Sequence, residues 1–175
     1  MKIGIDLGGS HVGVGIIEDA ELLISKDKIF TEEDKQNIEN SIVKYIDELI
    51  NEVLDEKGIT IDQIEKIGVA APGTVAGGCI TSYNLGLKGF NLQAILEQKY
   101  TQPIRVRNDG KCAALAEKKY GAMKDYDDCV FVNIRLDSTP FHSFIIFDNS
   151  LVGKSSVKSI QCIPTSIFSL LRKQT

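Results

Sequence analysis

The sequence contains no tryptophan, only two histidines and four cysteines among its 175 residues. The cysteines, Cys79, Cys112, Cys129 and Cys162, are widely scattered and form no C-x-x-C pair, so neither a zinc site nor a disulfide framework is indicated. Reduced thiols are the simplest account, and we expect a cytoplasmic protein. No apolar run approaches membrane-spanning length, and no signal-peptide pattern precedes the first expected strand.

The sequence also lacks an excess of positive charge. It has 20 Lys and Arg against 24 Asp and Glu, a formal net charge of −4. This balance argues against a general affinity for nucleic acid, whose phosphates attract basic surfaces. We therefore expect neither nucleic acid nor a membrane as a partner, and nothing in the sequence supports an oligomer. The length suffices for one domain with a core, or for one small domain and part of another.

Apolar periodicity predicts strands and helices in the order β-β-β-α-β-α-β-α, followed by one more strand. The expected strands are Lys2–Asp6, Val12–Glu18, Glu21–Lys28, Lys66–Ala71, Pro103–Arg107 and Cys129–Ile134. The expected helices run from about Ile38 to a stop at Lys57-Gly58, from an N-cap at Asn91 to Tyr100, and from Asp109 to about Tyr120. This order predicts an α/β fold with a mixed sheet and helices on its faces, and it is not a Rossmann order.

The turn between the first two strands, Gly8-Gly9-Ser10, is the first candidate site. Glycines allow a positive φ and present bare N–H groups, which suits a phosphate, and Ser10 adds a hydroxyl donor. Asp6 stands at the end of the first strand, where a carboxylate can hold Mg²⁺ through water. A plain hairpin with a glycine turn is the alternative, and the hairpin alone favours it.

Two further strands end in polar or glycine residues. Asp109 follows a strand at a strand-to-helix junction, where it can act as a general base, and Asn108 can bind a polyol. Pro72-Gly73 forces a turn at the same kind of edge, where the Gly73 backbone can approach a ligand. The alternatives are a helix cap for Asn108 or Asp109 and an ordinary β-turn for Gly73. A loop at Asn84–Asn91 is either a pocket wall or a connector.

Together these four segments resemble the ROK family of sugar kinases, which includes bacterial glucokinases. Gly4-Ile-Asp-Leu-Gly-Gly-Ser10 is similar to the family's first phosphate motif, with Ser10 in place of Thr. Val69-Ala-Ala-Pro-Gly73 resembles G-x-P-G, and Asn84-Leu-Gly-Leu-Lys-Gly resembles N-L-x-W-x-G with Leu87 in place of Trp. The run from Asn108 to Glu117 resembles N-D-A-N-x-A-A-L-A-E, departing at Gly110 and Lys111. The resemblance runs from Met1 to about Ile134.

The resemblance implies an actin-like, ribonuclease-H-like ATPase domain that phosphorylates a hexose or amino-hexose with ATP. It implies that Asp109 is the catalytic base and that Gly73, Asn108 and Asp109 touch the sugar. It further implies a phosphate site for ATP, with Mg²⁺ held near Asp6 through water. The residues that would line the ATP phosphates are Gly8, Gly9, Ser10 and His11. From its spacing alone His11 is a turn residue.

The resemblance weakens in the second part of the chain. We expect an ATPase domain over residues 1–124 and a truncated, diverged start of a second domain over residues 125–175. Where the family has a second glycine clamp for phosphate, Arg135–His142 contains no glycine, and the family's Cys/His zinc motif is absent. We therefore expect little or no kinase activity from this chain alone. The alternative is a non-catalytic sugar- or nucleotide-binding remnant; the family's repressors fit poorly, because they carry an N-terminal helix-turn-helix.

Overall fold

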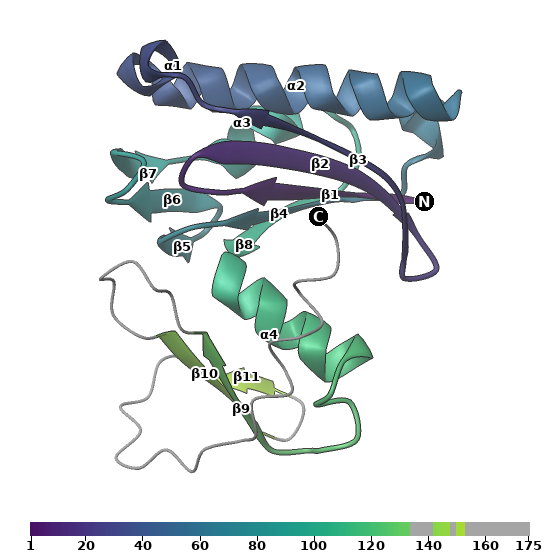
Figure 1. Cartoon of the computed structure of the whole chain (residues 1–175), viewed down its shortest axis with the longest axis vertical. Helices are drawn as coiled ribbons and strands as arrows, with labels where there is room; N and C mark the ends of the chain where they lie inside the picture. Colours follow the sequence, from purple (N-terminus) through teal and green to yellow (C-terminus); the bar gives the residue numbers. More distant parts are fainter. Residues whose placement is uncertain (134–141, 148–149, 153–175) are drawn as a thin grey trace. The chain divides into compact units, whose positions relative to one another are not determined.

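A five-stranded mixed sheet is the centre of the first of two units, residues 1–109 and 110–175, in this computed structural model (Figure 1). The structure describes residues 1–133, 142–147 and 150–152. The strand order is β3-β2-β1-β4-β8. β1 runs antiparallel to β2 and parallel to β4, and β4 runs parallel to β8. The strands are β1 (Lys2–Leu7), β2 (His11–Glu18), β3 (Glu21–Ile29), β4 (Ile67–Ala71) and β8 (Ile104–Asn108).

The first three strands form the predicted meander, with alternate residues on opposite faces. Ile3, Ile5 and Leu7 of β1 are buried, whereas Lys2 and Asp6 are exposed. Asp19 and Ala20, the two residues between the second and third expected strands, form the turn that joins β2 to β3. Both turn residues have a positive φ, +47° and +69°, as a two-residue hairpin turn requires.

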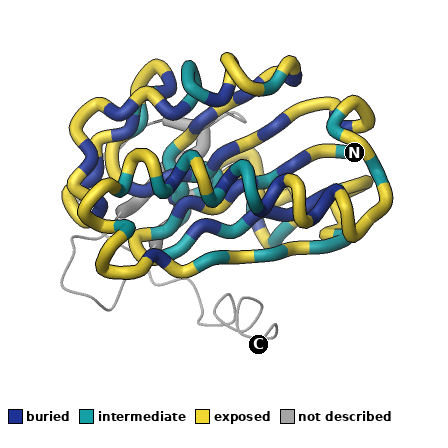
Figure 2. The backbone as a smooth tube through the Cα atoms, turned by 90° about the horizontal axis from the view of Figure 1, so that it is seen from above, coloured by how far each residue is buried: buried dark blue, intermediate teal, exposed yellow. Residues whose placement is uncertain are grey.

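Two helices cover one face of this sheet (Figures 1 and 2). α2 (Ile38–Lys57) buries an apolar stripe against the sheet. Burial of each side chain in this stripe stabilises the folded protein by about 1.5–3 kcal/mol. The predicted stop is confirmed: Gly58 has φ +65° and its N–H bonds to the last turn. α3 (Leu92–Lys99) begins at its predicted cap, where Asn91 Oδ1 accepts from the Ala94 N–H at 3.1 Å. The buried residues of α2 are Ile42, Ile46, Leu49, Ile50, Val53 and Leu54.

A second, three-stranded sheet was not predicted. Its strands are β5 (Thr74–Ala76), β6 (Cys79–Ser82) and β7 (Leu87–Phe90), in that order and antiparallel. The expectation that Asn84–Asn91 is all loop is therefore wrong, because Leu87 and Phe90 are buried and hold β7 against the core. Gly77 and Gly78, with φ of +56° and +82°, make the tight turn between β5 and β6.

Two short helical elements also lie in stretches for which the sequence predicted no helix, α1 (Glu32–Gln36) and the 3₁₀ turn η1 (Ile61–Gln63). α1 is held by one carboxylate. The backbone N–H and the hydroxyl of Thr31 donate to Asp34 Oδ2 at 2.8 and 2.7 Å, and the Tyr45 hydroxyl of α2 donates to the same oxygen at 2.7 Å. Tyr45 also stacks on Phe30, with ring centroids 5.8 Å apart. One carboxylate therefore joins α1 to the long helix.

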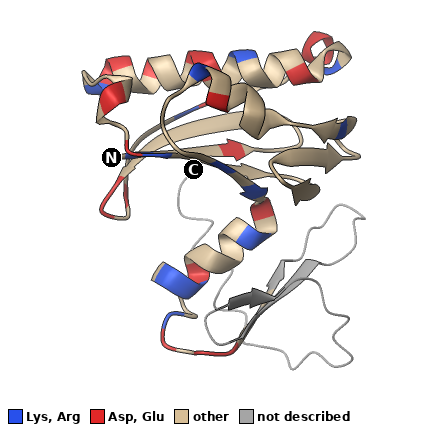
Figure 3. Cartoon of the chain, turned by 180° about the vertical axis from the view of Figure 1, so that it is seen from behind, with Lys and Arg blue, Asp and Glu red and all other residues tan. Residues whose placement is uncertain are grey.

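Ion pairs connect the edge strand β3 to α2. Lys28 Nζ lies 2.7 Å from Glu48 and 2.8 Å from Glu52, and Lys26 Nζ lies 2.6 Å from Glu56. The three glutamates are four residues apart, so they share one side of the helix. Figure 3 shows charged residues of both signs along α2. Because these side chains are partly exposed, the pairs contribute little stability, but lysines on an edge strand also discourage pairing with another chain.

The second unit contains most of α4 (Asp109–Tyr120) and an antiparallel sheet in the order β11-β10-β9. Its strands are β9 (Cys129–Asn133), β10 (His142–Phe147) and β11 (Ser150–Val152), which agrees with the predicted helix to Tyr120 and strand at Cys129. The glycine-free residues 135–141 lie outside the described residues, as does Ile167–Leu171, where the apolar residues indicate a fragment of helix. Over the described ranges, no helix has the length and apolarity needed to cross a membrane.

The backbone strain at Ala20 leads to a first prediction. We expect Ala20→Gly to raise the free energy of unfolding by about 0.5–1 kcal/mol, because relief of the left-handed penalty exceeds the extra chain entropy of glycine. Urea unfolding measures the change. Ala94→Gly in α3 is the control, and it should instead lower stability by about 1 kcal/mol. A destabilised Ala20→Gly variant would contradict the assigned turn.

The bonds to Asp34 lead to a prediction about pH. Hydrogen bonds from the Thr31 N–H, the Thr31 hydroxyl and the Tyr45 hydroxyl lower the pKa of Asp34 below its ordinary value of 3.8. A lowered pKa gives stability that is present above pH 3.8 and is lost as the pH falls through the lowered value. We expect Asp34→Asn to be less stable than the parent at neutral pH and less acid-sensitive below about pH 4. Urea midpoints across this range test it, with Asp62→Asn as a control carboxylate; an unchanged acid slope in Asp34→Asn would refute it.

Candidate functional site

The predicted site residues of the first unit lie along one edge of the sheet. β1, β4 and β8 are parallel, so their carboxyl ends meet at the same edge. The register pairs Asp6 with Ala70 on β4, and pairs Asn108 on β8 with the next β4 residue, Ala71. Asp6 and Asn108 are therefore separated by a single strand, two interstrand spacings or roughly 10 Å. This carboxyl edge is where open α/β sheets bind ligands.

Asn108 connects the residues predicted to hold a sugar. Its side-chain Nδ2 donates to the Gly73 carbonyl at 2.8 Å and to Asp109 Oδ1 at 2.9 Å. One amide group thus fixes the turn after β4 relative to the carboxylate after β8. Asp109 is also the first residue of α4, where the positive end of the helix dipole favours a carboxylate. The alternative interpretation, in which Asn108 or Asp109 caps the following helix, is therefore also compatible with where these residues lie.

Gly73 occupies a place that no other residue fits. Its φ is +85°, and a Cβ there would lie 2.3 Å from the Thr81 carbonyl oxygen and 3.0 Å from Ser82 Cα. The turn after β4 therefore packs directly against β6. This contact brings the unpredicted sheet β5-β6-β7 next to the part of the carboxyl edge formed by β4 and β8. The sequence signal that could have predicted its first hairpin is the Gly77-Gly78 pair between the apolar residues Val75 and Ile80.

The glycine turn between β1 and β2 differs from its expected backbone. Neither Gly8 nor Gly9 has a positive φ, so that expectation is wrong. The Gly8 N–H bonds the His11 carbonyl at 2.9 Å, and the His11 ring lies where a Gly8 Cβ would be, 2.6 Å from Cε1. Close approach of this ring is therefore why glycine fits at position 8. The Ser10 carbonyl accepts from the Phe30 N–H at 2.8 Å, which ties the turn to the end of β3.

The turn presents free hydrogen-bond donors. Within the part of the chain that the structure describes, the amide N–H groups of Gly9 and Ser10 have no partner, and both residues are exposed. Unpaired backbone N–H groups beside a hydroxyl suit an anion such as a phosphate. His11 has its Nε2 3.8 Å from Asp6 Oδ2, so the imidazole borders both the turn and the carboxylate.

Asp6 is accessible to a cation. Its side chain is 67% exposed, and its neighbour on β2 is Gly13, whose missing Cβ leaves the space beside the carboxylate open. Oxygen donors of this kind suit Mg²⁺, which binds one or two carboxylates together with phosphate oxygens. Asp27 of β3 flanks Gly13 on its other side and was not singled out from the sequence. No group of three or more His, Cys, Asp or Glu suited to a metal occurs among the described residues.

Comparisons with known proteins point to one family. A family model described as "ROK family" matches residues 2–151. A xylose repressor of Caldicellulosiruptor bescii is 26% identical over 161 residues, covering 85% of this chain and 37% of the repressor. A β-glucoside kinase of Listeria monocytogenes is 27% identical over 136 residues, covering 77% of this chain and 44% of the kinase. A ROK hexokinase structure from Thermus thermophilus has a TM-score of 0.68 at 24% identity, covering 86% of this chain and 48% of that one.

These matches confirm the predicted fold class. The mixed five-stranded sheet with its helices matches the N-terminal half of the ROK, actin-like ATPase architecture. The chain spans less than half the length of the curated relatives it matches. They include sugar kinases and repressors, so the matches alone do not assign a reaction.

The packing at Gly73 leads to a prediction with a built-in control. We expect Gly73→Ala to destabilise the protein by roughly 3 kcal/mol, because it adds a clash with a backbone carbonyl to the left-handed penalty. Gly77→Ala has the same left-handed penalty, but no atom lies within 4 Å of the added Cβ. It should therefore lower the free energy of unfolding by only about 1–2 kcal/mol. Urea unfolding of both variants measures the difference. Equal losses would show that the contact with β6 is not tight.

Proposed function

The chain belongs to the ROK family, and we propose that its first 109 residues form one side of a sugar-kinase active site. In this proposal, ATP donates a phosphoryl group to a hydroxyl of a hexose or amino-hexose. ROK kinases bind ATP, and phosphoryl transfer depends mainly on positioning and on stabilising charge. The carboxyl edge offers a sugar end at β4 and β8 and a phosphate end at β1 and β2.

At the sugar end, Asp109 is the proposed general base. A carboxylate that accepts the proton of the attacking hydroxyl is a main protein contribution to such a transfer, typically about 10²–10⁴-fold in rate. Asn108 and the Gly73 backbone are proposed to hold the sugar. The Asn108 bonds to Gly73 and Asp109 are the single observation that best supports this assignment, since they hold all three groups in one geometry.

At the phosphate end, Gly8, Gly9, Ser10 and His11 are proposed to contact the ATP phosphates. The free N–H groups of Gly9 and Ser10 and the exposed position of Ser10 support this role. Asp6 is the proposed carboxylate for Mg²⁺, held through water. Mg²⁺, when bound there, would supply positive charge that offsets the negative charge of the phosphates. The roughly 10 Å between the two ends leaves room for the transferred group.

A second candidate is a non-catalytic sugar- or nucleotide-binding module derived from such a kinase. Two of the matched relatives support this second candidate, because they are named as repressors and not as enzymes. Both candidates use the same edge and the same residues. They differ in turnover, since only the kinase requires the Asp109 carboxylate as a base.

Titration and a coupled assay separate the two candidates. We expect calorimetry with a hexose panel and with Mg-ATP to show binding of both, and Asn108→Ala to weaken sugar binding by about tenfold, since it removes a hydrogen bond and loosens Gly73. Any turnover of Mg-ATP with sugar should fall at least about 100-fold in Asp109→Asn, because the variant keeps its size but has no base.

The outcomes are distinct. Sugar binding without turnover favours the binding module, whereas turnover that depends on Asp109 supports the kinase. Turnover that survives Asp109→Asn contradicts the role of the base. Absence of both sugar and ATP binding contradicts the whole proposal. Asp62→Asn, which alters an exposed carboxylate in η1, is the matched control and should change neither ligand binding nor turnover.

A further inference from the structure

Tyr83 is the most exposed large apolar side chain among the described residues, with a relative exposure of 99%. An exposed aromatic residue on a protein surface usually needs no explanation. Tyr83 differs from the other tyrosines in its surroundings. The Tyr45 and Tyr100 hydroxyls bond Asp34 and Asp47, and Tyr120 and Tyr126 are 60% and 64% exposed. The ring of Tyr83 alone is almost entirely in solvent.

The backbone under Tyr83 is firmly held. Ser82 before it is 3% exposed and belongs to β6, and Leu85 after it is 7% exposed. The Gly86 N–H donates to the Tyr83 carbonyl at 3.1 Å, closing a four-residue turn between β6 and β7. Because the backbone is already ordered, only the two side-chain torsions of Tyr83 lose freedom when a ligand packs against the ring.

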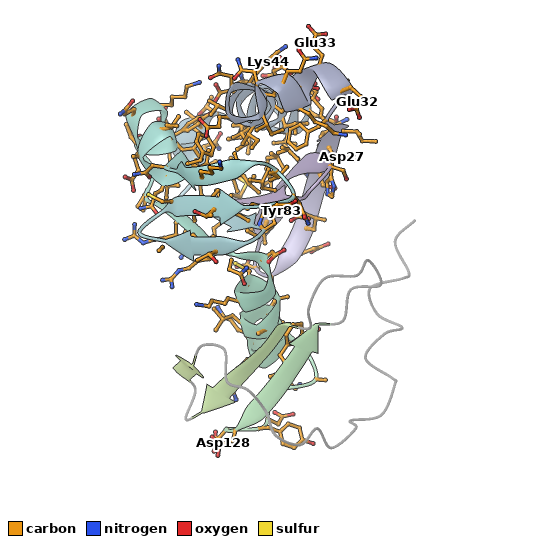
Figure 4. The ribbon with its side chains drawn as sticks, turned by 90° about the vertical axis from the view of Figure 1, so that its left-hand side faces the viewer. Asp27, Glu32, Glu33, Lys44, Tyr83 and Asp128 are labelled. Carbon is orange, nitrogen blue, oxygen red and sulfur yellow. The ribbon has the colours of Figure 1, made fainter. Side chains whose placement is uncertain are left out.

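The position of this turn gives Tyr83 its significance. Ser82, its neighbour in the chain, lies against Gly73, where an added Cβ would be 3.0 Å from Ser82 Cα. Gly73 is in turn bonded to Asn108, which is bonded to Asp109. Tyr83 therefore directly follows the residue that packs against Gly73 at the sugar end of the carboxyl edge. Figure 4 shows Tyr83 in the first unit, seen from the left-hand side of Figure 1.

We propose that Tyr83 is a sugar-binding residue that stacks on the apolar face of a pyranose ring held by Gly73 and Asn108. This inference rests on the proposed function, and it adds a specificity element to that site. The C–H groups on one face of a pyranose form an apolar patch with partial positive charge, which matches the negative face of an aromatic ring. Ligand sites commonly combine such aromatic surface with a few fixed polar groups. The sugar class selected is a cyclic pyranose, in preference to an open-chain polyol.

The absence of tryptophan from the sequence provides a direct test. Tyr83→Trp in the full chain makes a protein with one tryptophan, whose emission we expect to change saturably with a bound hexose such as glucose and not with sorbitol. Tyr126→Trp, at a partly covered tyrosine of the second unit, is the matched control and should not respond. Tyr83→Trp keeps an aromatic surface, so its sugar affinity should stay close to that of the parent.

Calorimetry of the parent and two further variants completes the test. We expect Tyr83→Ala to bind the hexose about five- to tenfold more weakly, as the loss of one aromatic contact predicts, and Tyr83→Phe to bind as the parent does. Equal affinity of Tyr83→Ala and parent, or an unchanged emission of the Tyr83→Trp variant at sugar saturation, overturns the assignment while leaving the proposed function intact. If the parent itself binds no sugar, the proposed function fails and the stacking role fails with it.

Discussion

The parallel pairing of β1, β4 and β8 is the constraint on which the candidate site depends. Each strand delivers a different segment to one edge: Asp6 from β1, the turn at Gly73 from β4, and Asn108-Asp109 from β8. These segments are far apart in the sequence, so no local interaction can bring them together. A slip of one residue in the β4–β8 register would also turn Asn108 to the opposite face and break its bond to Gly73.

The sheet divides its two faces between stability and access. Ile3, Ile5 and Leu7 of β1 lie on the face covered by α2 and α3, where they join one apolar core. The strand positions between the buried ones are small: Gly4 pairs with Gly15 and Gly68, and Asp6 with Gly13 and Ala70. Small neighbours leave the carboxylate of Asp6 without large side chains to cover it. The same alternation that builds the core thus keeps the phosphate end open.

Long periodic patterns were predictable from the sequence, and short-range geometry set by tertiary contact was not. The stripe of α2, the caps at Asn91 and Gly58 and the meander follow from apolar spacing and local chemistry. β7 was missed because its burial depends on packing against distant residues rather than on its own four-residue pattern. The backbone of Gly8 was misjudged because its close neighbour is the His11 ring, a contact made in the folded chain, and its φ is not positive. Motif residues predicted which groups share an edge, whereas the Asn108 bonds that join them appear only in three dimensions.

The central place of β1 also has a consequence for how the first unit folds. β1, β2 and β3 are consecutive and connect through tight turns, so they can pair as soon as the chain reaches Ile29. β4 pairs with β1 only after the chain reaches Ile67, which closes a long loop on Ile3. β8 then pairs with β4, beginning at Ile104. One side of β1 is an unpaired edge until β4 adds, and one side of β4 is an unpaired edge until β8 adds, so each is in turn open to other chains. Asn108, proposed to hold the sugar, ends this last strand, and Asp109, the proposed base, follows it, so their geometry can form only after the whole sheet has assembled.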